Sequence, residues 1–103
     1  MKKAFYWFTM CAKQGHAKGQ YNLGLMYFRG DGVTASDLEA FRWYKKSAEQ
    51  GYSQGQYNLG LMYFYGAGTL MNKKESAYWI KKAYESGYNK AKGFWDKNDL
   101  WKY

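Results

Sequence analysis

Apolar residues recur every three or four positions along most of the chain, and this spacing predicts helices. Within residues 17–29, for example, Leu23, Met26 and Tyr27 fall on one side of such a helix. Gly30 follows and predicts where the helix ends, because glycine enters the left-handed conformation without steric cost. No segment alternates apolar and polar residues as a half-buried strand does. The pattern therefore predicts an all-α protein.

A second helix is predicted to begin after Ser36. Ser36 and Glu39 have the spacing of a capping box, in which two side chains satisfy backbone N–H groups at the start of a helix. Asn72 and Glu75 repeat this arrangement, and Gly51 is expected to close the helix. The inward-facing stripes predicted for this helix and its later counterpart are Ala40, Trp43, Tyr44 and Ser47, and Ser76, Trp79, Ile80 and Ala83.

The two predicted helices form a unit that occurs twice in the chain. Residues 16–51 and 52–87 align without a gap and are identical at 18 of 36 positions. Residues 19–28 recur unchanged as residues 55–64. A fixed period of this length is typical of units that stack into a solenoid. We therefore predict one solenoid domain over residues 1–103, which is also an ordinary length for a single domain.

Both ends of the chain continue the register incompletely. Residues 1–15 correspond to the second helix of a unit without its first helix, which predicts an uncovered apolar face carrying Phe5 and Phe8. We expect this face to self-associate or to meet another part of a longer array. Residues 88–103 are predicted to form a C-terminal capping helix, because Asp96 replaces a glycine that both full units carry.

The first residues superficially resemble a secretory signal peptide. Lysines precede an apolar run over residues 4–12, but that run is rich in bulky aromatic residues and ends at Lys13 without a cleavage site. It is also far shorter than the roughly 20 residues that span a bilayer. The repeat register accounts for the run, so we expect no signal peptide and no membrane partner, and a cytoplasmic location is favoured.

The net charge of +8 suggests an alternative function, association with nucleic acid. Lys45 and Lys46 on one second helix and Lys81 and Lys82 on the next would form a basic ridge on the outer surface. However, the charge is spread along the chain, and lysines on a helix usually face solvent. We therefore expect nucleic acid to be an unlikely partner.

Catalytic and metal-binding patterns are missing from the sequence. The single histidine, His16, occupies a repeat position that is tyrosine at residues 52 and 88, so it predicts a packing or linker role. The single cysteine, Cys11, occupies a small-residue position and is expected to be buried. No spacing typical of a zinc site or of a nucleophile with its base occurs. We expect no enzymatic activity, no metal and no cofactor.

The repeated unit resembles the Sel-like repeat family, which is related to tetratricopeptide repeats. The resemblance rests on the Gln-Tyr-Asn-Leu-Gly segment, the Gly-x-Gly loop and the tryptophan of the second helix. It implies a right-handed α-solenoid of antiparallel helix pairs that acts as a scaffold or adaptor, as in bacterial complexes. A cysteine-rich subgroup of the family has a disulfide in each repeat. Cys11 has Ser47 and Ala83 at the equivalent positions, so that subgroup's properties do not carry over.

The first helix of each unit supplies the candidate binding residues. Aligned with tetratricopeptide units, these helices place polar and aromatic side chains on a concave face that would bind a peptide or protein. In the alternative interpretation the asparagines cap internal carbonyls and the aromatic residues pack between units. Binding of a small molecule or peptidoglycan fragment is a third possibility. The candidate residues are Lys18, Tyr21, Asn22, Leu25, Arg29, Gln54, Tyr57, Asn58, Leu61 and Tyr65, with Phe28 and Phe64 beside them.

Overall fold

A computed structural model describes residues 2–103, and within this part of the chain every regular element is a helix. This confirms the all-α prediction. The helices are α1 (Lys2–Lys13), α2 (Ala17–Arg29), α3 (Asp37–Glu49), α4 (Ser53–Tyr65), α5 (Lys73–Glu85) and α6 (Asn89–Lys97), followed by the short 3-10 helix η1 (Leu100–Lys102).

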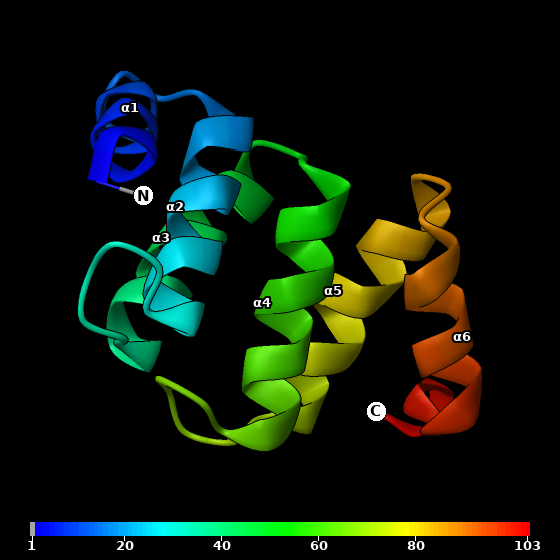
Figure 1. Ribbon diagram of the computed structural model, residues 1–103. Helices are drawn as coiled ribbons and strands as arrows, with labels where there is room; N and C mark the ends of the chain where they lie inside the picture. The colour runs from blue at the N-terminus through cyan, green and yellow to red at the C-terminus, as the bar shows by residue number, and fades with distance from the viewer. Residues whose placement is uncertain (1) are drawn as a thin grey trace.

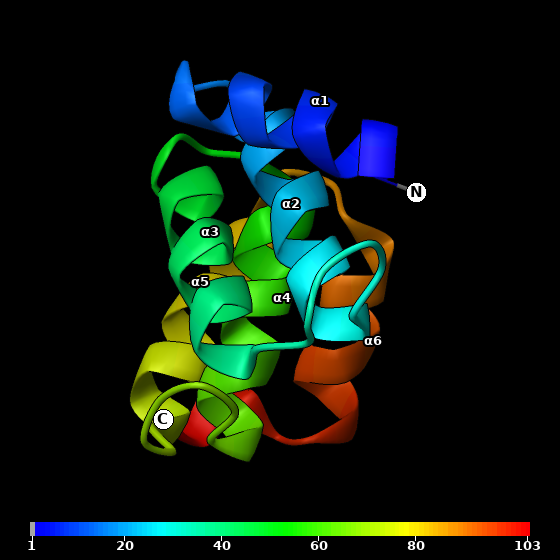
Figure 2. The same cartoon turned by 60° about the vertical axis from the view of Figure 1, so that its left-hand side comes forward.

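The helices stack as an α-solenoid. Each helix packs mainly against its neighbours in sequence. Helices α2, α4 and α6 form one layer, with α3 and α5 behind it (Figure 1), and Figure 2 shows α1 at one end of the stack. We call α2, α4 and α6 the A helices and α1, α3 and α5 the B helices. The molecule measures 42 × 24 × 17 Å, longer in one direction as expected of stacked pairs.

The helix ends follow the predicted signals. Gly30 and its counterpart Gly66 end α2 and α4 in the left-handed conformation, with φ of 75° and 70°. The Ser36 hydroxyl accepts a hydrogen bond from the Glu39 backbone N–H at 3.1 Å. The Ser36 N–H donates to the Tyr27 carbonyl rather than to the Glu39 side chain, so only one of the two bonds of the predicted capping box forms. The C-terminal ends of α2 and α4 therefore have the same local structure, as their repeated sequence predicts.

Two further glycines let the A and B helices of a unit approach closely. A Cβ on Gly24 would lie 2.6 Å from the ring of Tyr44, and one on Gly60 would lie 2.6 Å from the Cδ1 of Ile80. Both side chains are almost fully buried, at 1% and 0% exposure. Six of the eight residues in the predicted inward stripes are buried, whereas Trp43 and Trp79 are half-buried. The glycines define where each B helix packs closely on its A helix.

The N-terminal helix exposes a different face from the one predicted. Phe5 and Phe8 are half-buried, and the Phe5 ring packs edge-on against Tyr27 with centroids 5.8 Å apart. The prediction that these two phenylalanines lie uncovered was therefore wrong, because α1 leans its phenylalanine side onto α2. The large apolar side chains that α1 exposes are Tyr6, Trp7 and Met10.

The C-terminal segment is more than a capping helix. Helix α6 ends at Lys97, and Asp99 then turns the chain with a φ of 52°, in the left-handed region. This turn inserts Leu100 into the core, where it is completely buried beside Ile80 and Ala91. The sequence pattern predicted the polar replacement at Asp96, which is exposed, but not the apolar residue that covers the end of the stack.

Buried glutamines tie α2 and α4 to the B helices that precede them. The Gln20 side-chain amide donates to the Ala12 carbonyl at 3.2 Å, and Gln56 donates to Ala48 at 3.3 Å. In the first unit Gln50 completes the arrangement by donating to the Gln20 Oε1 at 2.7 Å. In the second unit the Gln56 Oε1 is buried without a hydrogen-bond partner among the described residues.

The missing partner has a simple cause in the sequence. Ser86 occupies the position equivalent to Gln50, and its short side chain bonds to the Lys82 carbonyl instead. The backbone is nearly the same at both positions, with φ and ψ of −89° and 2° at Gln50 and −84° and 4° at Ser86. A glutamine at residue 86 can therefore follow the same path to its A helix.

Ser86→Gln is expected to raise the free energy of unfolding by about 1 kcal/mol, because it satisfies a buried acceptor. The reciprocal change, Gln50→Ser, is the matched control and should lower it by a similar amount. Urea denaturation followed by circular dichroism measures both changes. Equal stability of Ser86→Gln and the wild type would contradict the assignment of an unsatisfied acceptor to Gln56.

Candidate functional site

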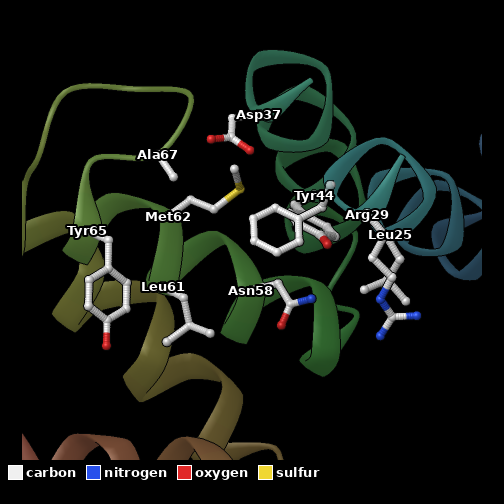
Figure 3. Close-up of a pocket in the computed structure, with 10 residues that line it drawn as sticks. Leu25, Arg29, Asp37, Tyr44, Asn58, Leu61, Met62, Tyr65 and Ala67 are labelled. Carbon is white, nitrogen blue, oxygen red and sulfur yellow. The ribbon is translucent and has the colours of Figure 1, made fainter. Parts of the chain in front are cut away.

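A pocket of about 520 Å³ hollows the surface between α2 and α4 (Figure 3). It exists because these two A helices touch each other little and are held apart by the B helix behind them. Side chains from both full repeats line it. The lining residues are Leu25, Phe28 and Arg29 of α2, Asp37 and Tyr44 of α3, Asn58, Leu61, Met62 and Tyr65 of α4, and Ala67 of the following loop.

A polar cluster lies at one side of this pocket. Burial raises the pKa of Tyr44 to about 12, and a hydrogen bond from Asn58 and the charge of Arg29 act in the opposite direction. Burial also raises the pKa of Tyr21, again against Arg29 and Asn58. Tyr44, Asn58 and Arg29 all line the pocket, and the centroids of the Tyr21 and Tyr44 rings are 6.0 Å apart.

The rest of the pocket is mostly apolar. Leu25 and Leu61 are half-buried on facing helices, and Met62 forms part of the floor with only 4% exposure. Tyr65 stands at the rim, 66% exposed, and its ring packs edge-on against Phe64 with centroids 5.1 Å apart. A partly closed apolar hollow with a few fixed polar groups at one side is the usual form of a binding site.

The structure brings together half of the predicted candidate residues. Leu25, Arg29, Asn58, Leu61 and Tyr65 line the pocket. Of the other five candidates, Lys18 and Asn22 line a second hollow. The rings of Tyr21 and Tyr57 pack against other aromatic rings, those of Tyr44 and Tyr52 and those of Tyr88 and Phe94 respectively. Gln54 is half-buried and lines neither pocket.

The second hollow lies one repeat earlier, between α1 and α2. Its volume is about 360 Å³. Phe8 and Asn22 line it at the positions that Tyr44 and Asn58 occupy in the first pocket. His16, the residue before α2, also lines it and is exposed. Its remaining lining residues are Trp7, Cys11, Lys18 and Gly19, and Cys11 is half-buried rather than buried as predicted.

Sequence reasoning missed the contribution of the B helix to the first pocket. Tyr44 was predicted only as a core residue, and Asp37 only as the first residue of a helix. The repeat offers one signal for Tyr44, because the equivalent positions carry Phe8 and Ile80 and no hydroxyl. The carbonyls of Ala12 and Ala48, near the ends of α1 and α3, are bound by Gln20 and Gln56.

Two lysines of the predicted basic ridge lie over aromatic rings of the same helices. Lys46 lies over the ring of Trp43 at 5.0 Å, and Lys82 lies over the ring of Tyr78 at 5.0 Å. Such cation–π contacts use two of the four lysines within their own helices. All four lysines are exposed.

Residues 2–103 contain neither a metal-binding cluster nor a membrane-spanning helix. In this range, no group of three or more histidine, cysteine, aspartate or glutamate side chains is placed to hold a metal ion. No helix there is long and apolar enough to cross a bilayer.

The family model of the Sel1 repeat matches residues 1–16, 17–52 and 53–88, which together cover most of the chain. The chain belongs to the Sel1 repeat family. This confirms the resemblance stated from the sequence. Sel1 repeats are generally modules for protein–protein interaction, and the proteins that contain them are generally non-catalytic scaffolds.

Solved structures of bacterial Sel1 repeat proteins have the same fold. A Sel1 repeat protein from Oxalobacter formigenes is 40% identical over 87% of this chain, with a TM-score of 0.85. The protective antigen c5321 of uropathogenic Escherichia coli is 42% identical over 82% of this chain, with a TM-score of 0.80. Helicobacter pylori cysteine rich protein B is 24% identical over 87% of the chain, with a TM-score of 0.83, and supports the fold alone.

These relatives differ from this chain in extent. The matched region covers 37% of the Oxalobacter protein, 18% of c5321 and 68% of cysteine rich protein B. No curated protein matched the chain.

Proposed function

We propose that this Sel1 repeat chain is a non-catalytic interaction module that binds a segment of a partner protein on the surface formed by its A helices. The pocket between α2 and α4 carries this proposal, since it combines an apolar hollow with a fixed polar cluster. An apolar side chain of the partner would enter the hollow, while Asn58 offers both a donor and an acceptor to its backbone.

The aromatic residues around the pocket support the same function. Tyr65 is 66% exposed, yet its ring is held against Phe64 and Phe94, with centroids 5.1 Å and 6.4 Å away. A rigid exposed tyrosine provides contact area without losing much conformational entropy on binding, which is why tyrosine is frequent at binding hot spots. Within residues 2–103, the basic ridge of the nucleic-acid alternative lines no comparable pocket.

Replacing Tyr65 by aspartate is expected to weaken binding at least tenfold, because it places a charge at the rim of an apolar pocket. Peptides would first be selected from a phage-displayed random library against the wild-type protein. Their affinities would then be measured by fluorescence anisotropy with synthetic copies.

Tyr78→Asp is the matched control for this substitution. Tyr78 is 51% exposed and lies on α5, in the layer behind the A helices. Its replacement should leave peptide affinity unchanged, and thermal unfolding of both variants verifies that they fold. Equal losses in the two variants, or peptides that bind Tyr65→Asp as well as the wild type, would contradict the proposed site.

A further inference from the structure

The charge around the pocket is arranged unequally. Helices α2 and α4 contain no acidic residue, whereas Lys18 and Arg29 lie on α2. Arg29 is exposed and lines the pocket. The ion pairs found within residues 2–103 all lie elsewhere, at Arg42, Lys92 and Lys102 with nearby acidic residues. The Arg29 guanidinium is therefore available to an incoming group.

The surroundings of Arg29 define where an anion would be placed. Figure 3 shows Arg29 on one side of the pocket and Tyr65 on the other, with Asp37 set apart from Arg29 and Tyr44 between them. Arg29, Asn58 and Tyr44 line the same pocket. An anion is thus favoured near Arg29 and disfavoured near Asp37, which would orient a bound segment.

The pocket has room for one bulky side chain beside this charged group. Its volume of about 520 Å³ falls within the range of about 300 to 1,000 Å³ that is typical of binding pockets. Leu25, Leu61 and Met62 offer an apolar surface to such a side chain. The planar guanidinium of Arg29 matches a carboxylate, with which it can form two parallel hydrogen bonds.

Building on the proposed function, we propose that the pocket selects partner segments in which a bulky apolar side chain stands close to an aspartate or glutamate, whose carboxylate pairs with Arg29. The apolar side chain fills the hollow between α2 and α4. The carboxylate binds at the end that holds Asn58 and Tyr44.

The test starts from peptides selected on the wild-type protein and resynthesised with both ends blocked, so that side chains supply the only carboxylates. Replacing the acidic residue of such a peptide by glutamine or asparagine should lower affinity about tenfold or more. Arg29→Glu should lower affinity for the acidic peptide to a similar degree. The Arg29→Glu protein should also bind a peptide in which lysine replaces the acidic residue, and it should bind that peptide more tightly than the wild-type protein does.

Lys81→Glu is the control for net charge. It makes the same change in charge on α5, where Lys81 is exposed away from the pocket, and should leave affinity unchanged. Arg29→Gln provides a second variant without a reversed charge at the end of α2, and it should show an intermediate loss. Thermal unfolding of each variant confirms that it folds.

The outcomes separate this inference from the proposed function. If the peptides bind the Tyr65→Asp protein more weakly but bind the Arg29→Glu protein as well as the wild type, the proposed preference for an acidic residue is wrong. The proposed binding site would still stand. A requirement for a free peptide C-terminus, with no effect of the acidic side chain, would also overturn it. If the selected peptides are insensitive to Tyr65→Asp as well, the proposed function itself fails.

Discussion

Gly24→Ala is expected to lower the free energy of unfolding by about 2 to 3 kcal/mol, because an added methyl group overpacks a filled core. The new Cβ would lie 2.6 Å from two ring carbons of Tyr44. That ring is 1% exposed and packs against Ala40 and Met62, so it has little space into which to move. For a domain of this size the loss corresponds to a fall in melting temperature of about 10 to 15 °C.

Gly93→Ala is the matched control in the same kind of helix. Gly93 lies within α6, and a Cβ there would meet no heavy atom within 4 Å. Alanine at this position should raise stability by about 0.5 to 1 kcal/mol, because it removes backbone freedom from the unfolded chain. Urea or thermal denaturation measures both variants. A stabilising Gly24→Ala would show that the helices of the first unit do not approach as closely as described.

Alkaline pH is expected to destabilise the fold through Tyr44. Burial raises the pKa of this tyrosine to about 12, against an ordinary value of about 10. The folded protein therefore holds the phenolic proton more tightly than the unfolded chain does. The stabilisation is fully present below about pH 10 and is lost as the pH rises through about 12. Two pH units correspond to about 2.7 kcal/mol.

Tyr44→Phe isolates this effect from the other groups that titrate at high pH. Phenylalanine fits the position in general terms, since Phe8 stands at the equivalent place in α1. At neutral pH the stability of the variant should lie within about 1 kcal/mol of the wild type, because only the hydroxyl is removed. Between about pH 10 and 12 its stability should fall less steeply than that of the wild type. Parallel pH profiles from urea denaturation would contradict a raised pKa at Tyr44.

The helices could be predicted from the sequence because their signals are local. Capping pairs such as Ser36 and Glu39, and the glycines that follow the A helices, act within one turn of backbone. The 36-residue repeat then supplied the stacking order. The close contact at Gly24 was also foreseeable, because glycine in the middle of a helix is otherwise unfavourable.

Features that depend on contact between helices were less predictable. The sequence showed that α1 has an apolar stripe, but it did not show which residues of the stripe would pack on α2. The contact between Phe5 and Tyr27 was therefore missed. Leu100 follows a left-handed Asp99, a turn for which the repeat offers no precedent. The residue types alone did not indicate whether the asparagines or the glutamines would bind internal carbonyls. In the structure, Gln20 and Gln56 bind them.

The candidate site was half predictable for a related reason. The A-helix register indicated Arg29 of α2 and Asn58 and Leu61 of α4, which line the pocket. Tyr44 reaches the pocket from the layer behind, which depends on the separation of α2 and α4 rather than on any pattern within one helix.

The two pockets also have a consequence for how the surface could read a partner. Asn22 and Asn58 hold equivalent places in hollows at successive junctions, so the spacing of the hollows equals the spacing of the repeats. Such a surface presents binding positions at regular intervals along the stack of repeats. Contacts that are weak one at a time would then act together on one extended segment, because the second contact becomes intramolecular once the first has formed. Selectivity would arise from the distance between anchor residues in the partner as well as from their chemistry.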